Sequence, residues 1–194
     1  MRNGSEIERA LQAVGELLAA DDFRFGVVVI GGAALNLLGV VDRATRDVDV
    51  VAVTEVPGHI ESIARPPSHL PAALTAAITQ VARDFELPDN WMNTGPAGQW
   101  DIGFLQGFAA RIAWTTYGGL DVGLADRLDL ICFKLDAAAD QPTSNNRHFR
   151  DLVALNPSDR ELAIASEWVH QKNVGAEHHN IIDRVAAYVT SLRK

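Results

Sequence analysis

The residues with the clearest chemical potential lie in one stretch, 25–53, which reads FGVVVIGGAALNLLGVVDRATRDVDVVAV. An apolar run ends at Gly31 and Gly32, and a second apolar run opens with Asp47 and Asp49. Side chains of a strand alternate between its two faces, so the two carboxylates are predicted to share one face. Neighbouring carboxylates repel each other unless a cation lies between them. The spacing therefore predicts a divalent-cation site, with Mg²⁺ as the expected ion.

The two glycines predict a place where a phosphate group can approach the backbone. Because Gly31 and Gly32 lack a Cβ, backbone N–H groups after the first apolar run are accessible to phosphate oxygens. Phosphoryl transfer builds negative charge on the attacking and leaving oxygens, and cations held by carboxylates neutralise that charge. The combination favours a nucleoside triphosphate as the ligand. Two other interpretations are solvated carboxylates at a strand edge and a dinucleotide site, although the stretch lacks the spacing G-x-G-x-x-G.

Hydrophobic periodicity predicts the elements that must position this site. In chain order they are a helix over Glu6–Ala20, a buried strand over Val27–Ile30, a helix over Ala33–Leu38, a strand over Val48–Val53, a loop over Pro57–Pro71, a helix over Leu70–Phe85, an irregular segment over Leu87–Phe104 that lines or covers the cleft, and strands over Arg111–Tyr117 and Leu120–Leu124.

The last third of the chain predicts helices. Asp126 is expected to cap a helix that runs to about Ala139, and Ser158 with Glu161 has the capping-box spacing. Two more helices are predicted over Phe149–Leu155 and over about Glu177–Leu192. We therefore expect an α+β fold with a small mixed sheet flanked by helices. Its α/β core would occupy residues 1–125, and a helical part over 126–194 would pack on that core.

Composition limits the classes of function. The chain is 47% hydrophobic and 22% charged, which is ordinary for a soluble globular protein. It contains no apolar run near the roughly 18 residues of a membrane helix. A single cysteine, Cys132, excludes an internal disulfide framework. We therefore expect a cytoplasmic protein without a membrane partner.

The net charge of −8 disfavours nucleic-acid binding by the molecule as a whole. Binding to DNA or RNA would need a local cationic surface. Arg147, His148 and Arg150 form one basic cluster that could contact an acceptor, and a solvated helix start explains the same cluster equally well.

These motifs resemble the DNA polymerase β-type nucleotidyltransferase superfamily, and within it the AbiEii-like group, which includes MenT-type toxins of toxin–antitoxin systems. The likeness rests on Gly31-Gly32 followed by RATRDVD at 43–49, and on RLDLICFKLDAA at 127–138 followed by RHFRDL at 147–152. It extends over about Phe25–Leu155.

The resemblance implies an Mg²⁺-dependent enzyme that transfers a nucleoside monophosphate from an NTP to an acceptor with loss of pyrophosphate. In such an enzyme, Gly31 and Gly32 approach the phosphates. Asp47 and Asp49 hold the metal ion.

Further roles are implied for residues on either side of these motifs. Arg43, Thr45 and Arg46 would add contacts to the nucleotide phosphates. Lys134 would reach the triphosphate as a point charge, and Asp151 would orient Lys134 or accept the proton of the attacking hydroxyl. The simpler interpretations are a surface lysine at Lys134 and a helix cap at Asp151.

The sequence departs from the superfamily pattern at two points. Gly32 stands where many members have a serine, so a hydroxyl contact to phosphate is missing unless Thr45 replaces it. Members with a polymerase-type site carry a third carboxylate on a later strand, and the nearby candidates here are Asp101 and Asp121. Without a third carboxylate, base function would fall to Asp151 or the protein would be inactive.

The acceptor and the partners stay open at this level. The resemblance implies the 3′ end of tRNA as an acceptor and a cognate antitoxin as a partner, whereas a protein side chain or a small molecule such as an aminoglycoside is an alternative acceptor. The alternative function is a catalytically degenerate nucleotidyltransferase fold that binds a nucleotide or a partner.

Overall fold

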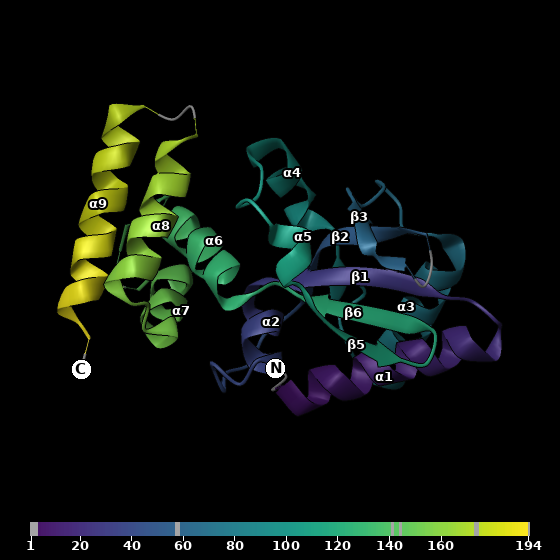
Figure 1. Cartoon of the computed structure of the whole chain (residues 1–194). Helices are drawn as coiled ribbons and strands as arrows, with labels where there is room; N and C mark the ends of the chain where they lie inside the picture. The colour runs from purple at the N-terminus through teal and green to yellow at the C-terminus, as the bar shows by residue number, and fades with distance from the viewer. Residues whose placement is uncertain (1–3, 57–58, 141, 144, 173–174, 194) are drawn as a thin grey trace. The chain divides into compact units, whose positions relative to one another are not determined.

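The computed structural model describes residues 4–56, 59–140, 142–143, 145–172 and 175–193 (Figure 1). Its contacts divide the chain into two compact units, Met1–Ala125 and Asp126–Lys194. The first unit contains a mixed β-sheet flanked by helices, and the described part of the second is helical. The expected α+β class is therefore confirmed.

The described part of the first unit contains six strands in one sheet of order β3-β2-β1-β6-β5, with β4 paired to β2. Strand β1 runs antiparallel to β2 and parallel to β6. In chain order the elements are α1 (Gly4–Ala20), β1 (Phe25–Ile30), α2 (Gly31–Leu37), β2 (Val48–Val56), β3 (His59–Ala64), α3 (Ala72–Asp84), β4 (Met92–Asn93), η1 (Gly95–Gly98), α4 (Gln99–Ile102), α5 (Phe108–Arg111), β5 (Ala113–Tyr117) and β6 (Leu120–Leu124).

The register of the strands shows which side chains lie on each face of the sheet. Val29 of β1 pairs with Val50 of β2 and with Leu124 of β6, so these three side chains share one face. Leu124 lines a pocket together with the first turns of α1, which places α1 on that face. Asp49, next to Val50, points to the opposite face. Figure 1 shows α1 on one side of the sheet and α4 and α5 on the other.

Helix α1 approaches the β5–β6 hairpin at a point where a side chain cannot fit. A Cβ at Gly15 would lie 1.7 Å from the carbonyl oxygen of Tyr117. Gly118, in the hairpin turn, has a φ of 55°. The Gly119 N–H donates a hydrogen bond of 2.8 Å to the Gly15 carbonyl. Close backbone contact therefore fixes α1 against the sheet.

The expected loop over Pro57–Pro71 is wrong in part, because β3 forms within it. Strand β2 is longer than predicted, and Thr54 and Val56 pair with Ile63 and His59 of β3. Residues 57 and 58 lie outside the described residues. The pairing with β2 supplies the order that the local sequence, with its flanking prolines, does not signal.

The second unit contains α6 (Arg127–Asp140), α7 (Arg147–Leu155), α8 (Asp159–His170) and α9 (Ala176–Ser191) in its described part. Two predicted caps are confirmed. Asp126 accepts a 2.9 Å hydrogen bond from the Leu128 N–H at the start of α6, and Ser158 and Glu161 form the capping box of α8.

The core of the second unit comes from fully buried side chains of α6, α7 and α9, among them Leu130, Ile131, Leu135, Leu152 and Ile182. Cys132 of α6 is also buried. Within the described ranges, the helices are all too short or too polar to cross a membrane.

Replacing Gly15 by alanine is expected to destabilise the protein by about 2 kcal/mol or more, because the added methyl collides with the Tyr117 carbonyl. This loss outweighs the gain of about 1 kcal/mol that alanine brings to a helix interior. The midpoint of urea unfolding measures the effect. Gly98→Ala is the matched control, since a Cβ at Gly98 meets nothing within 4 Å. Equal midpoints for the two variants would contradict the packing described for α1.

Candidate functional site

The end of β1 and the start of β2 meet at Gly31 and Asp49. Ile30, the last residue of β1, pairs in register with Asp49. A Cβ at Gly31 would lie 2.5 Å from Oδ2 of Asp49, and Gly31 has a φ of 75°. Both the close approach and the left-handed backbone require glycine here. The Asp49 carboxylate therefore lies directly against the glycine turn.

The second glycine is approached by a hydroxyl and a guanidinium group. A Cβ at Gly32 would lie 2.9 Å from Oγ1 of Thr45 and 3.4 Å from Nη2 of Arg43. The Thr45 side chain is buried, and its hydroxyl donates a 3.3 Å hydrogen bond to the Asp47 carbonyl. A serine at position 32 would therefore collide with Thr45. Of the residues predicted from sequence, the structure brings Gly31, Gly32, Arg43, Thr45 and Asp49 together.

Asp47 and Arg46 lie just before β2. The Asp47 side chain is half-buried and that of Arg46 is exposed. Both residues line a small hollow together with Ile7 of α1 and Trp91. The sharing of one face by the Asp47 and Asp49 carboxylates stays a prediction from strand spacing.

Two asparagines beside the turn were missed by sequence reasoning. Asn93 of β4 pairs in parallel register with Asp49, so the two side chains share a face. Asn36 is buried, and its Nδ2 donates a 3.0 Å hydrogen bond to the Gly32 carbonyl, which holds the turn. Strand β4 has two residues, which are too few to show the alternation that predicts a strand. Asn36 lies in a short apolar helix, and no sequence motif indicates a role for an asparagine at that position.

Asp121, one candidate for a third carboxylate, lies at the other end of β1 from Asp49. It pairs with Gly26, four residues and about 13 Å from the Ile30 end of the strand. Its carboxylate is 3% exposed and accepts a 2.6 Å hydrogen bond from the Thr116 hydroxyl. Asp121 therefore has a structural role in the β5–β6 hairpin, and the structure does not bring it to the glycine turn.

Asp101, the other candidate, is engaged at the surface by Arg65. Two hydrogen bonds of 2.7 and 3.0 Å join the guanidinium to the carboxylate, whose side chain is 67% exposed. These hydrogen bonds with Arg65, more than its charge, hold the pKa of Asp101 below its ordinary value. The neighbouring Trp100 donates a 2.7 Å hydrogen bond to the Val51 carbonyl and so fastens this segment to β2.

The donor set at the turn fits Mg²⁺ bound together with a nucleotide. The described residues contain no group of three His, Cys, Asp or Glu side chains that could hold a metal ion. Magnesium needs fewer protein ligands, since one or two carboxylates usually hold it with substrate phosphates and water. Asp49, with its carboxylate against the glycine turn, and the neighbouring Asp47 have the required hard oxygen ligands.

Lys134 of α6 and Asp151 of α7 form a buried ion pair within the second unit. Nζ of Lys134 donates a 2.7 Å hydrogen bond to Oδ2 of Asp151, and the side chains are 6% and 1% exposed. The surface interpretation of Lys134 is therefore wrong. The capping interpretation of Asp151 is also wrong, because Asn146 caps α7 by accepting from the His148 N–H.

The basic cluster lies on the first turn of α7. The side chains of Arg147 and Arg150 are exposed, and that of His148 is partly buried. Nε of Arg147 lies 3.5 Å from Nε2 of His148. The two arginines therefore present positive charge to solvent.

Residues 6–94 match the model of a family described as a nucleotidyltransferase of unknown function (DUF6036). The matched segment runs from α1 to β4 and includes the glycine turn, residues 43–47 and Asp49, whereas Lys134 and Asp151 lie beyond it. The match supports the nucleotidyltransferase superfamily and does not extend to the AbiEii-like group. Searches of curated proteins and of solved structures found no match.

Replacing Lys134 by methionine is expected to destabilise the protein by about 3–5 kcal/mol, because the Asp151 carboxylate loses its cation while it stays buried. The double variant Lys134→Met/Asp151→Leu is expected to be more stable than the single variant, since neither member of the pair is left behind as an uncompensated charge. Urea unfolding measures both.

Arg65→Gln is the control for the loss of an ion pair at the surface, and we expect it to unfold at the wild-type urea concentration. A Lys134→Met variant as stable as Arg65→Gln would contradict the burial of the Lys134–Asp151 pair.

Proposed function

We propose that this protein is an Mg²⁺-dependent nucleotidyltransferase that transfers a nucleoside monophosphate from an NTP to an acceptor hydroxyl. The observation that carries the proposal is the contact of the Asp49 carboxylate with the Gly31 turn, 2.5 Å from the position of a Cβ. The family match over the same residues supports it.

In this reaction the acceptor oxygen forms a bond to the α-phosphorus of the NTP. The bond between that phosphorus and the oxygen bridging to the β-phosphate breaks, and pyrophosphate leaves. The hydroxyl proton passes to a base or to water. When bound, Mg²⁺ neutralises charge on the phosphate oxygens, and Asp47 and Asp49 would hold it.

In the proposed enzyme, the glycine turn and the side chains of Thr45 and Arg43 bind the phosphates. The absence of a Cβ at Gly31 and Gly32 lets the triphosphate approach the backbone. On binding, the Thr45 hydroxyl would exchange its 3.3 Å hydrogen bond to the Asp47 carbonyl for one to a phosphate oxygen, and the Arg43 guanidinium would supply a charged donor beside it. The position of Thr45 over Gly32 supports the idea that its hydroxyl replaces the serine found in many superfamily members.

A triphosphate-binding role for Lys134, with Asp151 as its positioning residue, stays a prediction from the resemblance in sequence. The 2.7 Å contact between the two supports the positioning role.

The acceptor we propose is the 3′ end of tRNA, with a role as a toxin and a cognate antitoxin as partner. This part rests on the resemblance in sequence. The net charge of −8 requires a local cationic surface for tRNA, and the exposed Arg147 and Arg150 are candidates for it.

A second candidate function is NTP binding without transfer. The positions of Asp121 and Asp101 favour it, because Thr116 and Arg65 engage the two carboxylates that could have completed a polymerase-type site. The first of the following experiments separates the two functions.

Asp49→Asn is expected to lower label transfer from an α-³²P-labelled NTP to total tRNA in Mg²⁺ by more than about 100-fold, the scale for losing one charge-stabilising group. Its thermal unfolding should match that of the wild type, since the substitution relieves charge repulsion. Asp101→Asn, an acid engaged by Arg65, is the control and should keep full transfer. Undiminished transfer in Asp49→Asn defeats the proposal, and wild-type NTP binding with no transfer to any acceptor favours the second function.

Thr45→Val is expected to weaken NTP binding about tenfold, because it removes one hydrogen bond to a charged group and keeps the side-chain shape. Thr45→Ser retains the hydroxyl and should bind like the wild type. Gly32→Ser should bind poorly because it collides with Thr45, and Gly32→Ser/Thr45→Ala should recover part of the affinity. Calorimetric titration with a non-hydrolysable NTP and Mg²⁺ measures all four. Equal affinities for wild type and Thr45→Val would remove Thr45 from the site.

A further inference from the structure

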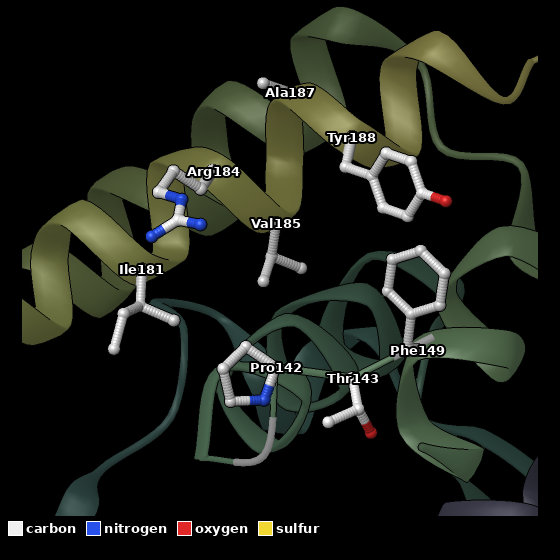
Figure 2. A pocket seen from close by; sticks show the side chains of 8 residues that line it. All are labelled: Pro142, Thr143, Phe149, Ile181, Arg184, Val185, Ala187 and Tyr188. Atoms are coloured by element: carbon white, nitrogen blue, oxygen red, sulfur yellow. The ribbon is translucent and has the colours of Figure 1, made fainter. Parts of the chain in front are cut away.

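The residues that line a pocket in the second unit have no role in the function proposed above. The pocket is bounded by α9, by Phe149 of α7 and by Pro142 and Thr143, which precede α7 (Figure 2). Its volume is about 440 Å³. Small-molecule sites occupy roughly 300–1,000 Å³, so the pocket has room for a ligand of that size.

One wall of the pocket is aromatic. The rings of Phe149 and Tyr188 stack with centroids 5.3 Å apart and an interplanar angle of 17°. Phe149 is 7% exposed, whereas Tyr188 is 50% exposed. Ile181 and Val185 lie on the same side of α9 as Tyr188 and continue the apolar lining. A flat apolar group is therefore the kind of ligand this wall accommodates.

The pocket also carries one positive charge. Arg184 is the only charged side chain among the described residues that line it, and it forms no ion pair with the described part of the chain. The preceding residue, Asp183, lies 3.2 Å from Nε2 of His170 instead.

The surroundings of Arg184 on α9 do not compensate its charge. The residues one turn away on either side are uncharged, namely Asn180, Ile181, Ala187 and Tyr188. In a chain with a net charge of −8, an arginine that lies beside an apolar pocket and forms no ion pair with the described residues favours an anionic ligand. The guanidinium fork matches the oxygens of a phosphate.

We propose that this pocket binds one nucleotide unit, with the base against Tyr188 and Phe149 and the phosphate at Arg184. A nucleotide joins a flat aromatic base to a phosphate. The base matches the aromatic wall of the pocket, and the phosphate matches the charge of Arg184. The inference rests on the proposed function in one respect, the choice of a nucleotide among flat aromatic anions. It adds to that function a nucleotide site separate from the glycine turn, which suits an acceptor made of nucleotides.

The test is a titration of ¹⁵N-labelled protein with AMP in EDTA, followed by amide chemical shifts. AMP lacks a triphosphate and EDTA removes Mg²⁺, which weakens binding at the glycine turn, and shifts at the pocket residues report on this pocket. We expect shifts at Phe149 and over Ile181–Tyr188. Arg184→Gln should weaken AMP binding about tenfold and leave adenosine binding unchanged. Arg160→Gln, an exposed arginine of α8, is the matched control and should bind like the wild type.

Tyr188 is tested by a pair of variants. Tyr188→Ala should weaken both AMP and adenosine about tenfold, the scale for stacking on one aromatic side chain. Tyr188→Phe keeps the ring and should bind like the wild type, which also shows that loss of binding in Tyr188→Ala does not come from loss of fold. Binding unchanged in both Tyr188→Ala and Arg184→Gln overturns the proposal.

Further ligands distinguish the source of the nucleotide. If a single-stranded RNA of about five nucleotides binds more tightly than AMP and shifts the same amides, the ligand of the pocket is part of an RNA strand. If the RNA and AMP bind with equal affinity, the ligand is a free mononucleotide. Phenyl phosphate binding as tightly as AMP, or no shift on α9 with any nucleotide, overturns the proposal. Absence of Asp49-dependent transfer together with AMP binding on α9 would remove the proposed enzyme and leave this site standing.

Discussion

The contact between Gly31 and the Asp49 carboxylate is the constraint on which the candidate site depends. The turn after β1 has a φ of 75° and passes so close to Asp49 that a Cβ would lie 2.5 Å from Oδ2. The antiparallel pairing of Ile30 with Asp49 brings the carboxylate there. A slip of one residue in this register would turn Asp49 toward the face that α1 covers. The sheet, its helical cover and the site are therefore linked through one backbone pairing.

The buried pair of Lys134 and Asp151 is a different kind of constraint. Replacing a buried ion pair by apolar side chains of similar volume is often neutral or stabilising, so such a pair is weak evidence for stability alone. Here both side chains are at least nine-tenths buried and joined at 2.7 Å, between two helices that already share an apolar core. The pair does fix the orientation of the lysine amine between α6 and α7.

The parts of the fold and site that sequence predicted are those governed by short-range rules. Strand alternation and the glycine turn are local, so Gly31 and Asp49 could be found from spacing. Asn93 and strand β3 could not, because pairing with β2 is what makes those short segments strands. The approach of Thr45 to Gly32 depends on the path of the chain after α2. The burial of Lys134 depends on packing against α7, which the mixed pattern of α6 does not reveal.

The distribution of charge bears on where a polyanion could meet this protein. Nine of the 17 Lys and Arg residues lie in the second unit, with ten of the 25 Asp and Glu residues, so most of the net charge of −8 belongs to the first unit. Coulomb repulsion of a nucleic-acid strand is therefore weaker at the second unit. That unit also presents Arg147, Arg150 and Arg184 on α7 and α9. Under the proposed function, a nucleic-acid acceptor would therefore meet less repulsion at the helices of the second unit than at the first.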